Sequence, residues 1–470
     1  MTFNSLEYAA FLPLVFVVYW LLPRRPQNMV LLIASYVFYG AFDWRFLGLL
    51  MLSTVTDYTV GRLLAATANR QRSAIFAISL VVNLGILGFF KYFNFFIRDG
   101  SRFLGELGIH LAPPVVQILL PIGISFFTFH GMSYTFDIYR RHIEPTHSLL
   151  DFAVFVAFFP QLVAGPIGRA DVQLPQFARD RVRPNWAQTR RALFLILLGL
   201  FKKVAVADAL ASQVNNAFST PATTSFLGLL VGMWAFAFQI YGDFSGYSDI
   251  ARGSAFLLGI DLPENFNQPY FSRSVTEFWR RWHISLSTWL RDYVYIPLGG
   301  NRGGELATYR NLLLTMLIGG LWHGAATTFV VWGGLHGLYL IGERRFTSAH
   351  SEDYRRPWLL RRDLWRTLLT FQLVCVAWVF FRAPSTTAAL RYLIGIADLQ
   401  GGVTDRKAIV LLALAGAAIV FIDLVQRRAG DHAALVDLSP ALRGVVYGLM
   451  VVAIVIWSGG TSVPFIYFQF

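Results

Sequence analysis

One histidine of this chain lies in an unusually apolar setting. His323, which follows Trp322 and precedes Gly324, belongs to the run 312–340, and this run contains no Asp, Glu, Lys or Arg. An ionisable side chain is costly at membrane depth, so it usually faces a protein interior or a cavity, where it can bind, relay or abstract a proton. We therefore expect His323 to be functional. Two alternatives are that His323 only packs against a backbone carbonyl, or that His336 is the working base.

A second histidine lies in the tryptophan-rich segment 272–290. At 100° per residue, seven apolar side chains of this segment share one face of a helix. They are Val275, Phe278, Trp279, Trp282, Leu286, Trp289 and Leu290. The pattern predicts one interfacial amphipathic helix with a membrane-anchoring tryptophan belt, and His283 at the edge of its apolar face. The following glycine-rich turn, 299–304, contains Arg302 and could wrap a ligand.

Two carboxylates lie at or near membrane depth. Asp243 and Asp249 belong to the segment 241–249, where one apolar stretch ends and another begins. Ionisable groups at this depth pair with one another or with other polar groups. We expect the partners of these carboxylates to be nearby arginines or His283.

The composition places the whole chain in a membrane. Of its 470 residues 55% are hydrophobic and 14% are charged, and the mean hydropathy is +0.51. Long apolar stretches of about 20 residues predict membrane-spanning helices, whereas a barrel would show short alternating segments. The one cysteine, Cys375, excludes an intrachain disulfide and a thiolate metal cluster, and we expect no bound metal. The net charge of +13 comes from loop arginines and does not indicate nucleic-acid binding.

The positions of the arginines predict the topology, because positively charged loops stay in the cytoplasm. Cytoplasmic segments are expected at 24–25, 62–72, 140–141, 169–191, 273–310 and 344–366. The segment 208–225, with Asp208 as its one charge, is expected outside, as is the N-terminus. Full crossings are predicted at 6–22, 29–42, 44–62, 74–93, 117–137, 190–207, 223–241, 367–381, 407–425 and 442–459. The stretch with Lys91, Arg98 and Arg102 falls outside in this arrangement, against the rule.

Two apolar regions do not fit alternate crossings. The region 152–167 contains Pro160, Gly165 and Pro166 between basic loops, and it is predicted to be re-entrant. The region 310–344 has arginines at both ends, which predicts a hairpin of two short helices with His323 near its tip. The expected fold is therefore all-α: one integral membrane domain over 1–470, a polytopic helical bundle with re-entrant, broken and interfacial helices.

Several motifs resemble the membrane-bound O-acyltransferase family. The stretch RRWHISLSTWLRDYVYIPLGGNR is followed, forty residues after its histidine, by the histidine of GGLWHGA. The stretches PIGISFFTFHGMSYTFDIYR, FFPQLVAGPI, FQIYGDFSGYSDIARG, LPENFNQPY and PFIYFQF extend the resemblance over most of the chain. Within the family the chain most resembles the membrane subunits of bacterial alginate O-acetyltransferases. The family's two signature histidines map onto His323 and His283.

The resemblance implies an O-acetyltransferase with acetyl coenzyme A as its donor substrate and no bound cofactor. His323 is then the base that deprotonates an acceptor hydroxyl, and His283 orients the acceptor or stabilises an oxyanion. Trp322 and Asp243 are further candidates for substrate binding. The phosphates of the coenzyme would meet a basic face on the cytoplasmic side, made by Arg280, Arg281, Arg291 and Arg302. The acetyl group would cross the bacterial inner membrane to an extracytoplasmic polysaccharide, with the help of a separate soluble acetyltransferase.

Three other functions fit part of the pattern. A proton-coupled secondary transporter could relay protons through His323, Asp243 and Asp249, although the chain shows no internal repeat. A scaffold with a decayed site could recruit a soluble acetyl-transferring partner. An enzyme of the same family could acylate teichoic acid, peptidoglycan or cellulose in place of alginate.

Overall fold

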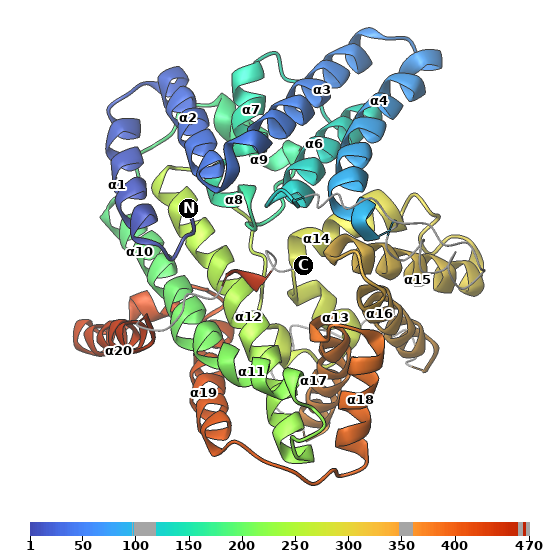
Figure 1. Ribbon diagram of the computed structural model, residues 1–470. Coiled ribbons are helices and arrows are strands. Elements are labelled where there is room, and N and C mark those ends of the chain that lie inside the picture. Colours follow the sequence, from blue (N-terminus) through green and yellow to red (C-terminus); the bar gives the residue numbers. More distant parts are fainter. Residues whose placement is uncertain (96, 98–118, 347–360, 459–463, 467–470) are drawn as a thin grey trace. The chain divides into compact units, whose positions relative to one another are not determined.

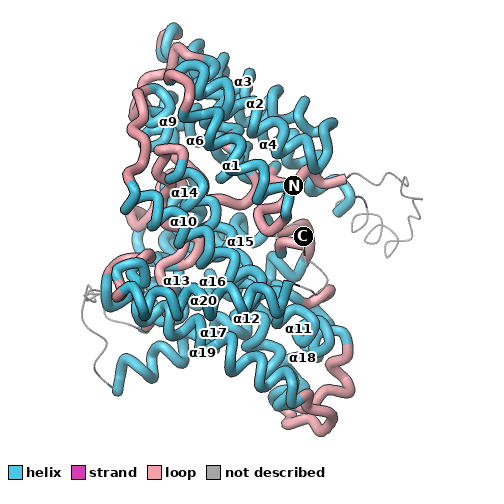
Figure 2. The backbone as a smooth tube through the Cα atoms, turned by 90° about the vertical axis from the view of Figure 1, so that its left-hand side faces the viewer, coloured by secondary structure: helices cyan, strands magenta, loops and turns pink. Residues whose placement is uncertain are grey.

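The computed structural model describes residues 1–95, 97, 119–346, 361–458 and 464–466, and this part of the chain is helical and contains no strand (Figures 1 and 2). Arg98, Arg102, the start of the crossing predicted at 117–137 and the last four residues of the terminal motif lie outside the described residues. The chain forms two compact units. Unit 1 contains Met1–Thr189 and Ser254–Pro263, and unit 2 contains Arg190–Gly253 and Glu264–Phe470. The single domain over 1–470 stays a prediction.

Six helical stretches of the described residues are long and apolar enough to cross a membrane, in agreement with a polytopic helical protein. They are Arg24–Ala66, Arg70–Phe95, Phe226–Leu257, Asp363–Arg382, Arg406–Ala429 and Pro440–Ser458. The helix at the first predicted crossing, α1 (Leu6–Trp20), has 15 residues and is shorter than the roughly 20 that a perpendicular crossing needs.

Unit 1 combines longer helices with a segment of short, broken ones. Its helices are α1, α2 (Arg24–Asp43), α3 (Leu47–Ala66), α4 (Asn69–Leu87), α6 (Ile124–Tyr139), α7 (Leu149–Ala157), α8 (Phe159–Leu162) and α9 (Ala170–Ala178). The region predicted to be re-entrant is broken between α7 and α8 at Phe158, beside Pro160, and it is buried throughout. Buried irregular backbone of this kind is tolerated at membrane depth because protein covers it.

Unit 2 carries both candidate histidines. Its helices are α10 (Trp186–Leu200), the π-helical turn η3 (Phe201–Asp208), α11 (Ala209–Ser219), α12 (Phe226–Leu257), α13 (Val275–Arg281), α14 (Ile284–Leu290), η5 (Arg291–Tyr295), α15 (Gly304–His323), α16 (Thr327–Phe346), α17 (Arg361–Arg382), α18 (Thr386–Ala397), α19 (Arg406–Ala429) and α20 (Pro440–Ser458). Two of these helices cross the division: α10 belongs to unit 2 from Arg190 onward, and the last residues of α12, from Ser254, belong to unit 1.

The predicted hairpin with His323 at its tip is confirmed. Helices α15 and α16 pack along each other, and His323 is the last residue of α15 (Figure 1). Glycines permit this close approach, because a Cβ on Gly320 would lie 2.2 Å from the carbonyl oxygen of Phe329 and one on Gly333 would lie 2.3 Å from that of Met316. Each helix has 20 residues, about 30 Å, so the two helices are longer than expected.

The single amphipathic helix expected over 272–290 is wrong. Two short helices, α13 and α14, are separated at His283, whose backbone is left-handed with φ 43°. The carbonyl oxygen of Asn265 accepts a hydrogen bond of 2.9 Å from the amide of Ile284, which gives the second helix a new start. Trp282 and Trp289 are buried inside the protein and form no membrane-facing belt. Helical periodicity could not reveal this break, because a distant residue causes it.

Candidate active site

His323 is enclosed by aromatic rings. The centroid of its imidazole lies 4.9 Å from those of Trp322 and Trp332 and 5.3 Å from that of Phe381, and all three pairs meet edge to face. These rings come from α15, α16 and α17. Only 4% of the residue is exposed. Such walls exclude water and strengthen electrostatic interactions at the imidazole.

His283 is held in place by Asn265. The side-chain oxygen of Asn265 lies 3.1 Å from Nδ1 of His283, and it also accepts hydrogen bonds from the amide and the hydroxyl of Ser285, at 3.2 and 2.9 Å. An amide N–H can only donate, so the Asn265 atom that meets it is the carbonyl oxygen. The same oxygen can only accept from His283, which therefore carries its proton on Nδ1 and leaves Nε2 as an acceptor. Burial lowers the pKa of His283 to about 3, so this ring is neutral at physiological pH.

Trp322 lies between the two histidines. Its ring centroid is 5.8 Å from that of His283 and 4.9 Å from that of His323. His283 also contacts Phe244 of α12, with ring centroids 4.6 Å apart. The structure thus brings His283, Trp322 and His323 into one connected group, as the sequence analysis required. Whether each takes part in the chemistry stays a prediction.

His336 is part of the aromatic packing behind this group. Its Nδ1 accepts a hydrogen bond of 3.2 Å from the indole nitrogen of Trp279, and its ring is stacked on Phe278 at 6.1 Å. Trp332 touches both His336 and His323, with centroids 4.9 Å away in each case. Because the Nδ1 lone pair of His336 is already occupied, the geometry favours a packing role for this residue over that of the base.

Asp243 and Asp249 form buried ion pairs with lysines, so the expected arginine or His283 partners are wrong. Lys202 lies 2.8 Å from Asp249, and Lys203 lies 2.8 Å from both Asp243 and Asp208. We call these five residues the ion-pair cluster. The π-helical turn η3 presents two consecutive lysines to neighbouring acidic residues, and a π-turn shifts side chains from their α-helical positions. Asp243 also accepts a bond of 2.7 Å from the amide of Ile466, so it is occupied by structural contacts.

The four arginines of the predicted basic face differ in their surroundings. Arg281 lies 2.9 Å from Glu277, and it also donates to the carbonyl oxygen of Asn267 at 3.1 Å. Arg291 lies 2.6 Å from the neighbouring Asp292. Arg280, Arg291 and Arg302 are all exposed, whereas Arg281 is partly buried. The residue of the set that is tied most firmly to the fold is therefore Arg281.

Several residues of this site could not be predicted from the sequence. Asn265 lies in the motif LPENFNQPY, but nothing in its spacing indicated a bond to His283. Trp332 and Phe381 were visible only as apolar residues of membrane helices, and Lys202 only as a charge inside the crossing predicted at 190–207. Within the part of the chain that the structure describes, no three His, Cys, Asp or Glu side chains come together as a metal site would require.

These features define a class of protein: a polytopic helical membrane protein whose buried histidines share an aromatic enclosure. A family model, that of the membrane-bound O-acyltransferase family, matches residues 124–382, which include both histidines. The probable alginate O-acetylase AlgI of Azotobacter vinelandii is 46% identical over 390 residues, 81% of this chain and 74% of that protein. The probable alginate O-acetylase AlgI of Pseudomonas putida is 38% identical over an alignment of 489 residues, 98% of each chain. The peptidoglycan O-acetyltransferase of Helicobacter pylori is 38% identical over 424 residues, 83% of this chain and 79% of that protein.

The chain belongs to the membrane-bound O-acyltransferase family. It is a multi-pass membrane enzyme, an O-acetyltransferase. Both statements agree with the resemblance that the motifs around His283 and His323 indicate.

Proposed function

We propose that this enzyme moves an acetyl group from cytoplasmic acetyl coenzyme A across the inner membrane to an extracytoplasmic glycan, an alginate-like exopolysaccharide, with a soluble acetyltransferase as partner. The observation that carries the proposal is the position of His323, at the tip of a hairpin and inside an aromatic enclosure that it shares with His283. The relatives named for acetylation of alginate and of peptidoglycan support a glycan as the acceptor class.

The proposed chemistry uses the imidazole of His323 inside its aromatic enclosure. Nε2 or Nδ1 of His323 takes the proton of an acceptor hydroxyl as the hydroxyl oxygen attacks the thioester carbonyl. The tetrahedral intermediate collapses with cleavage of the carbon–sulfur bond, and the coenzyme leaves as a thiol that receives the proton. The acetyl group ends on the acceptor oxygen as an ester. Exclusion of water by Trp322, Trp332 and Phe381 protects the thioester from hydrolysis.

The tautomer of His283 selects between its two expected roles. Its Nδ1–H donates to Asn265, so Nε2 has a lone pair and no proton. A lone pair can accept a hydrogen bond from an acceptor hydroxyl, but it cannot donate one to an oxyanion. His283 therefore serves to orient the hydroxyl, and oxyanion stabilisation falls to other donors.

The donor reaches the site from the basic side of unit 2. Arg280 and Arg302 are exposed and suit the phosphates of a coenzyme, with Arg291 beside them in sequence. Arg281 is bound to Glu277 and contributes mainly by holding α13 in place. Because the ion-pair cluster occupies Asp243 and Asp249, the proton relay that a transporter would need is not supported.

The test uses the purified full chain in nanodiscs with radiolabelled acetyl coenzyme A and measures coenzyme release and label transfer. The wild type is expected to turn over, and His323→Ala is expected to abolish turnover. His142→Ala, which changes an exposed histidine of unit 1, is the matched control and should behave as wild type. His336→Gln should retain more turnover than His323→Ala. Turnover that persists in His323→Ala, or that is lost only in His336→Gln, would refute the assignment of the base.

A further inference from the structure

Two side-chain nitrogen atoms of α16 are buried without a hydrogen-bond partner. They are Nε1 of the Trp332 indole and Nε2 of His336, and neither meets a partner in the part of the chain that the structure describes. Trp332 is 1% exposed and His336 is fully buried. A buried polar group without a partner costs free energy, so each such group in a native protein calls for an explanation. Catalysis is one explanation, because a substrate can supply the missing partner.

The tautomer of His336 follows from its bond with Trp279. The indole N–H of Trp279 can only donate, and it lies 3.2 Å from Nδ1 of His336. Nδ1 is therefore the acceptor of this bond, and the ring carries its proton on Nε2. Nε2 of His336 is thus a hydrogen-bond donor, which agrees with the assignment of the base to His323. Together Trp332 and His336 hold two buried N–H groups.

The two residues lie one helical turn apart on the same face of α16, next to the proposed base. The ring centroids of Trp332 and His336 are 4.9 Å apart, and that of Trp332 is also 4.9 Å from that of His323. Helix α16 packs against α15, which ends at His323, and against α17, which carries Phe381 (Figure 1). An acyl group bound against the imidazole of His323 therefore has Trp332 as a direct neighbour.

The stretches that supply the aromatic enclosure carry no charge. The runs 312–340 and 367–381 contain no Asp, Glu, Lys or Arg. They offer only neutral donors to an oxyanion that forms beside His323. His283 is not such a donor, because its Nε2 carries no proton. Neutral N–H groups fixed in a setting from which water is excluded stabilise an oxyanion more strongly than they would in water.

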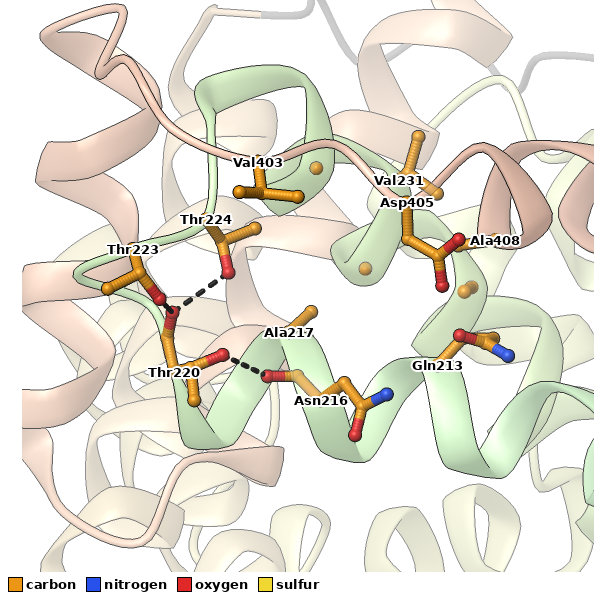
Figure 3. A pocket seen from close by; sticks show the side chains of 13 residues that line it. Gln213, Asn216, Ala217, Thr220, Thr223, Thr224, Val231, Val403, Asp405 and Ala408 are labelled. Atoms are coloured by element: carbon orange, nitrogen blue, oxygen red, sulfur yellow. Dashed lines mark hydrogen bonds between the residues drawn. The ribbon is translucent and has the colours of Figure 1, made fainter.

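A pocket elsewhere in unit 2 shows polar side chains that the protein itself satisfies. It is lined by α11, α12 and the start of α19 (Figure 3). The hydroxyl of Thr220 donates to the carbonyl oxygen of Asn216 at 2.9 Å, and those of Thr223 and Thr224 donate to that of Thr220 at 3.3 and 2.8 Å. Each of these hydroxyl hydrogens is used inside the protein. The N–H groups of α16 are buried more deeply, yet no described residue accepts from them.

We propose that the indole N–H of Trp332 and the Nε2–H of His336 form the oxyanion hole of the acyl transfer, an inference that rests on the proposed function for the identity of the reaction. As the acceptor oxygen bonds to the thioester carbon, its proton passes to His323 and the carbonyl π electrons move to the carbonyl oxygen. The two N–H groups donate to this oxyanion and keep their protons. Collapse restores the carbonyl and breaks the carbon–sulfur bond, and the leaving sulfur receives the proton from His323.

The test removes the N–H of Trp332 from the full chain in nanodiscs, with acetyl coenzyme A as donor. In Trp332→Phe kcat should fall by about 10²–10³ while KM changes little, because the oxyanion exists only in the transition state. Site-specific incorporation of a benzothiophene analogue of tryptophan at this position keeps the size of the ring and its shielding of the thioester, and replaces the N–H by sulfur. It should give the same loss of kcat at an unchanged melting temperature, because no acceptor in the protein loses a bond.

The second donor has its own pair of variants. His336→Gln keeps an acceptor for Trp279 and an N–H donor, whereas His336→Leu keeps neither, so kcat should be about tenfold or more higher in the glutamine variant. Trp234→Phe is the matched control and should keep the kcat of the wild type, since its indole N–H donates to Gln372 at 3.2 Å. A wild-type kcat with the analogue at position 332, or equal kcat in the two His336 variants, would overturn the oxyanion hole. If His323→Ala still abolished turnover, the proposed function would stand without it.

Discussion

The ion-pair cluster and the histidine group of unit 2 both hold polar side chains away from water, but by different means. In the cluster each charge meets an opposite charge at 2.8 Å, as Lys202 does with Asp249. Around His323 the neighbours are rings at 4.9 to 5.3 Å, and they satisfy no charge. Buried ion pairs are compatible with the fold because each charge compensates the other. The proposed role of His323 as a base rests on this aromatic enclosure and not on an ion pair.

The largest effect that separates the two regions is expected at His323. His323→Gln removes the base while it keeps a polar side chain of similar size, so turnover should fall by about 10²–10⁴. Thermal unfolding should change little, since no charge loses its partner. Coenzyme release measures the loss of turnover, and the melting temperature measures the change in stability. If His323→Gln lost much stability and kept part of its activity, His323 would be a structural residue like those of the ion-pair cluster.

The opposite result is expected at Lys202. Lys202→Ala leaves Asp249 as an uncompensated buried carboxylate, which should lower the free energy of unfolding by roughly 3–5 kcal/mol. The double variant Lys202→Met/Asp249→Leu removes both charges and should recover most of that loss. Denaturation in detergent compares the three proteins. If the double variant is as unstable as the single one, the pairing does not explain the stability.

A smaller effect on both stability and turnover is expected at Asn265, because this residue bonds both His283 and the start of α14. Asn265→Ala deprives His283 and Ser285 of their shared acceptor, so stability should fall by about 1–3 kcal/mol. Turnover should fall because the His283 ring loses its fixed tautomer and orientation. Asn267→Ala is the control, since Asn267 bonds Arg281 through its backbone. Equal behaviour of the two variants would contradict the role of Asn265.

The smallest effect concerns pH. The folded pKa of His283, about 3, lies below the unfolded value of about 6.5, so only the unfolded chain binds this proton between those values. The stability contributed by neutral His283 is therefore present above pH 6.5 and is lost as the pH falls, by about 1.4 kcal/mol per unit. His283→Asn tolerates the left-handed backbone and cannot titrate. Melting at pH 6.5 and 5.5 should show a shallower slope in the variant, and parallel slopes would contradict the prediction.

Much of the architecture could be predicted because it follows from local patterns. Long apolar runs indicate helices in any surroundings, and the basic ends of the region 310–344 with its central glycines indicated a hairpin that the structure confirms. The expectation that His323 is functional follows from the same logic, since an ionisable ring in an apolar run has few explanations, and it stays a prediction.

The predictions that proved wrong have a common physical reason. The break at His283 depends on Asn265, eighteen residues away, and the partners of Asp243 and Asp249 come from a turn about forty residues earlier. Periodicity describes one element at a time, so it cannot report bonds between elements. The tryptophans of 272–290 show the same limit, because an apolar face predicts burial without saying whether lipid or protein covers it.

The sequence by itself thus determined that this protein is a helical membrane protein with a buried histidine, and its motifs indicated the family. These properties depend on composition, spacing and short stretches of chain. The tertiary structure alone decided which rings enclose His323, which tautomer His283 adopts and which charges are paired. Each of these depends on side chains from different helices meeting at a few ångströms, and that meeting is set by packing rather than by any local pattern.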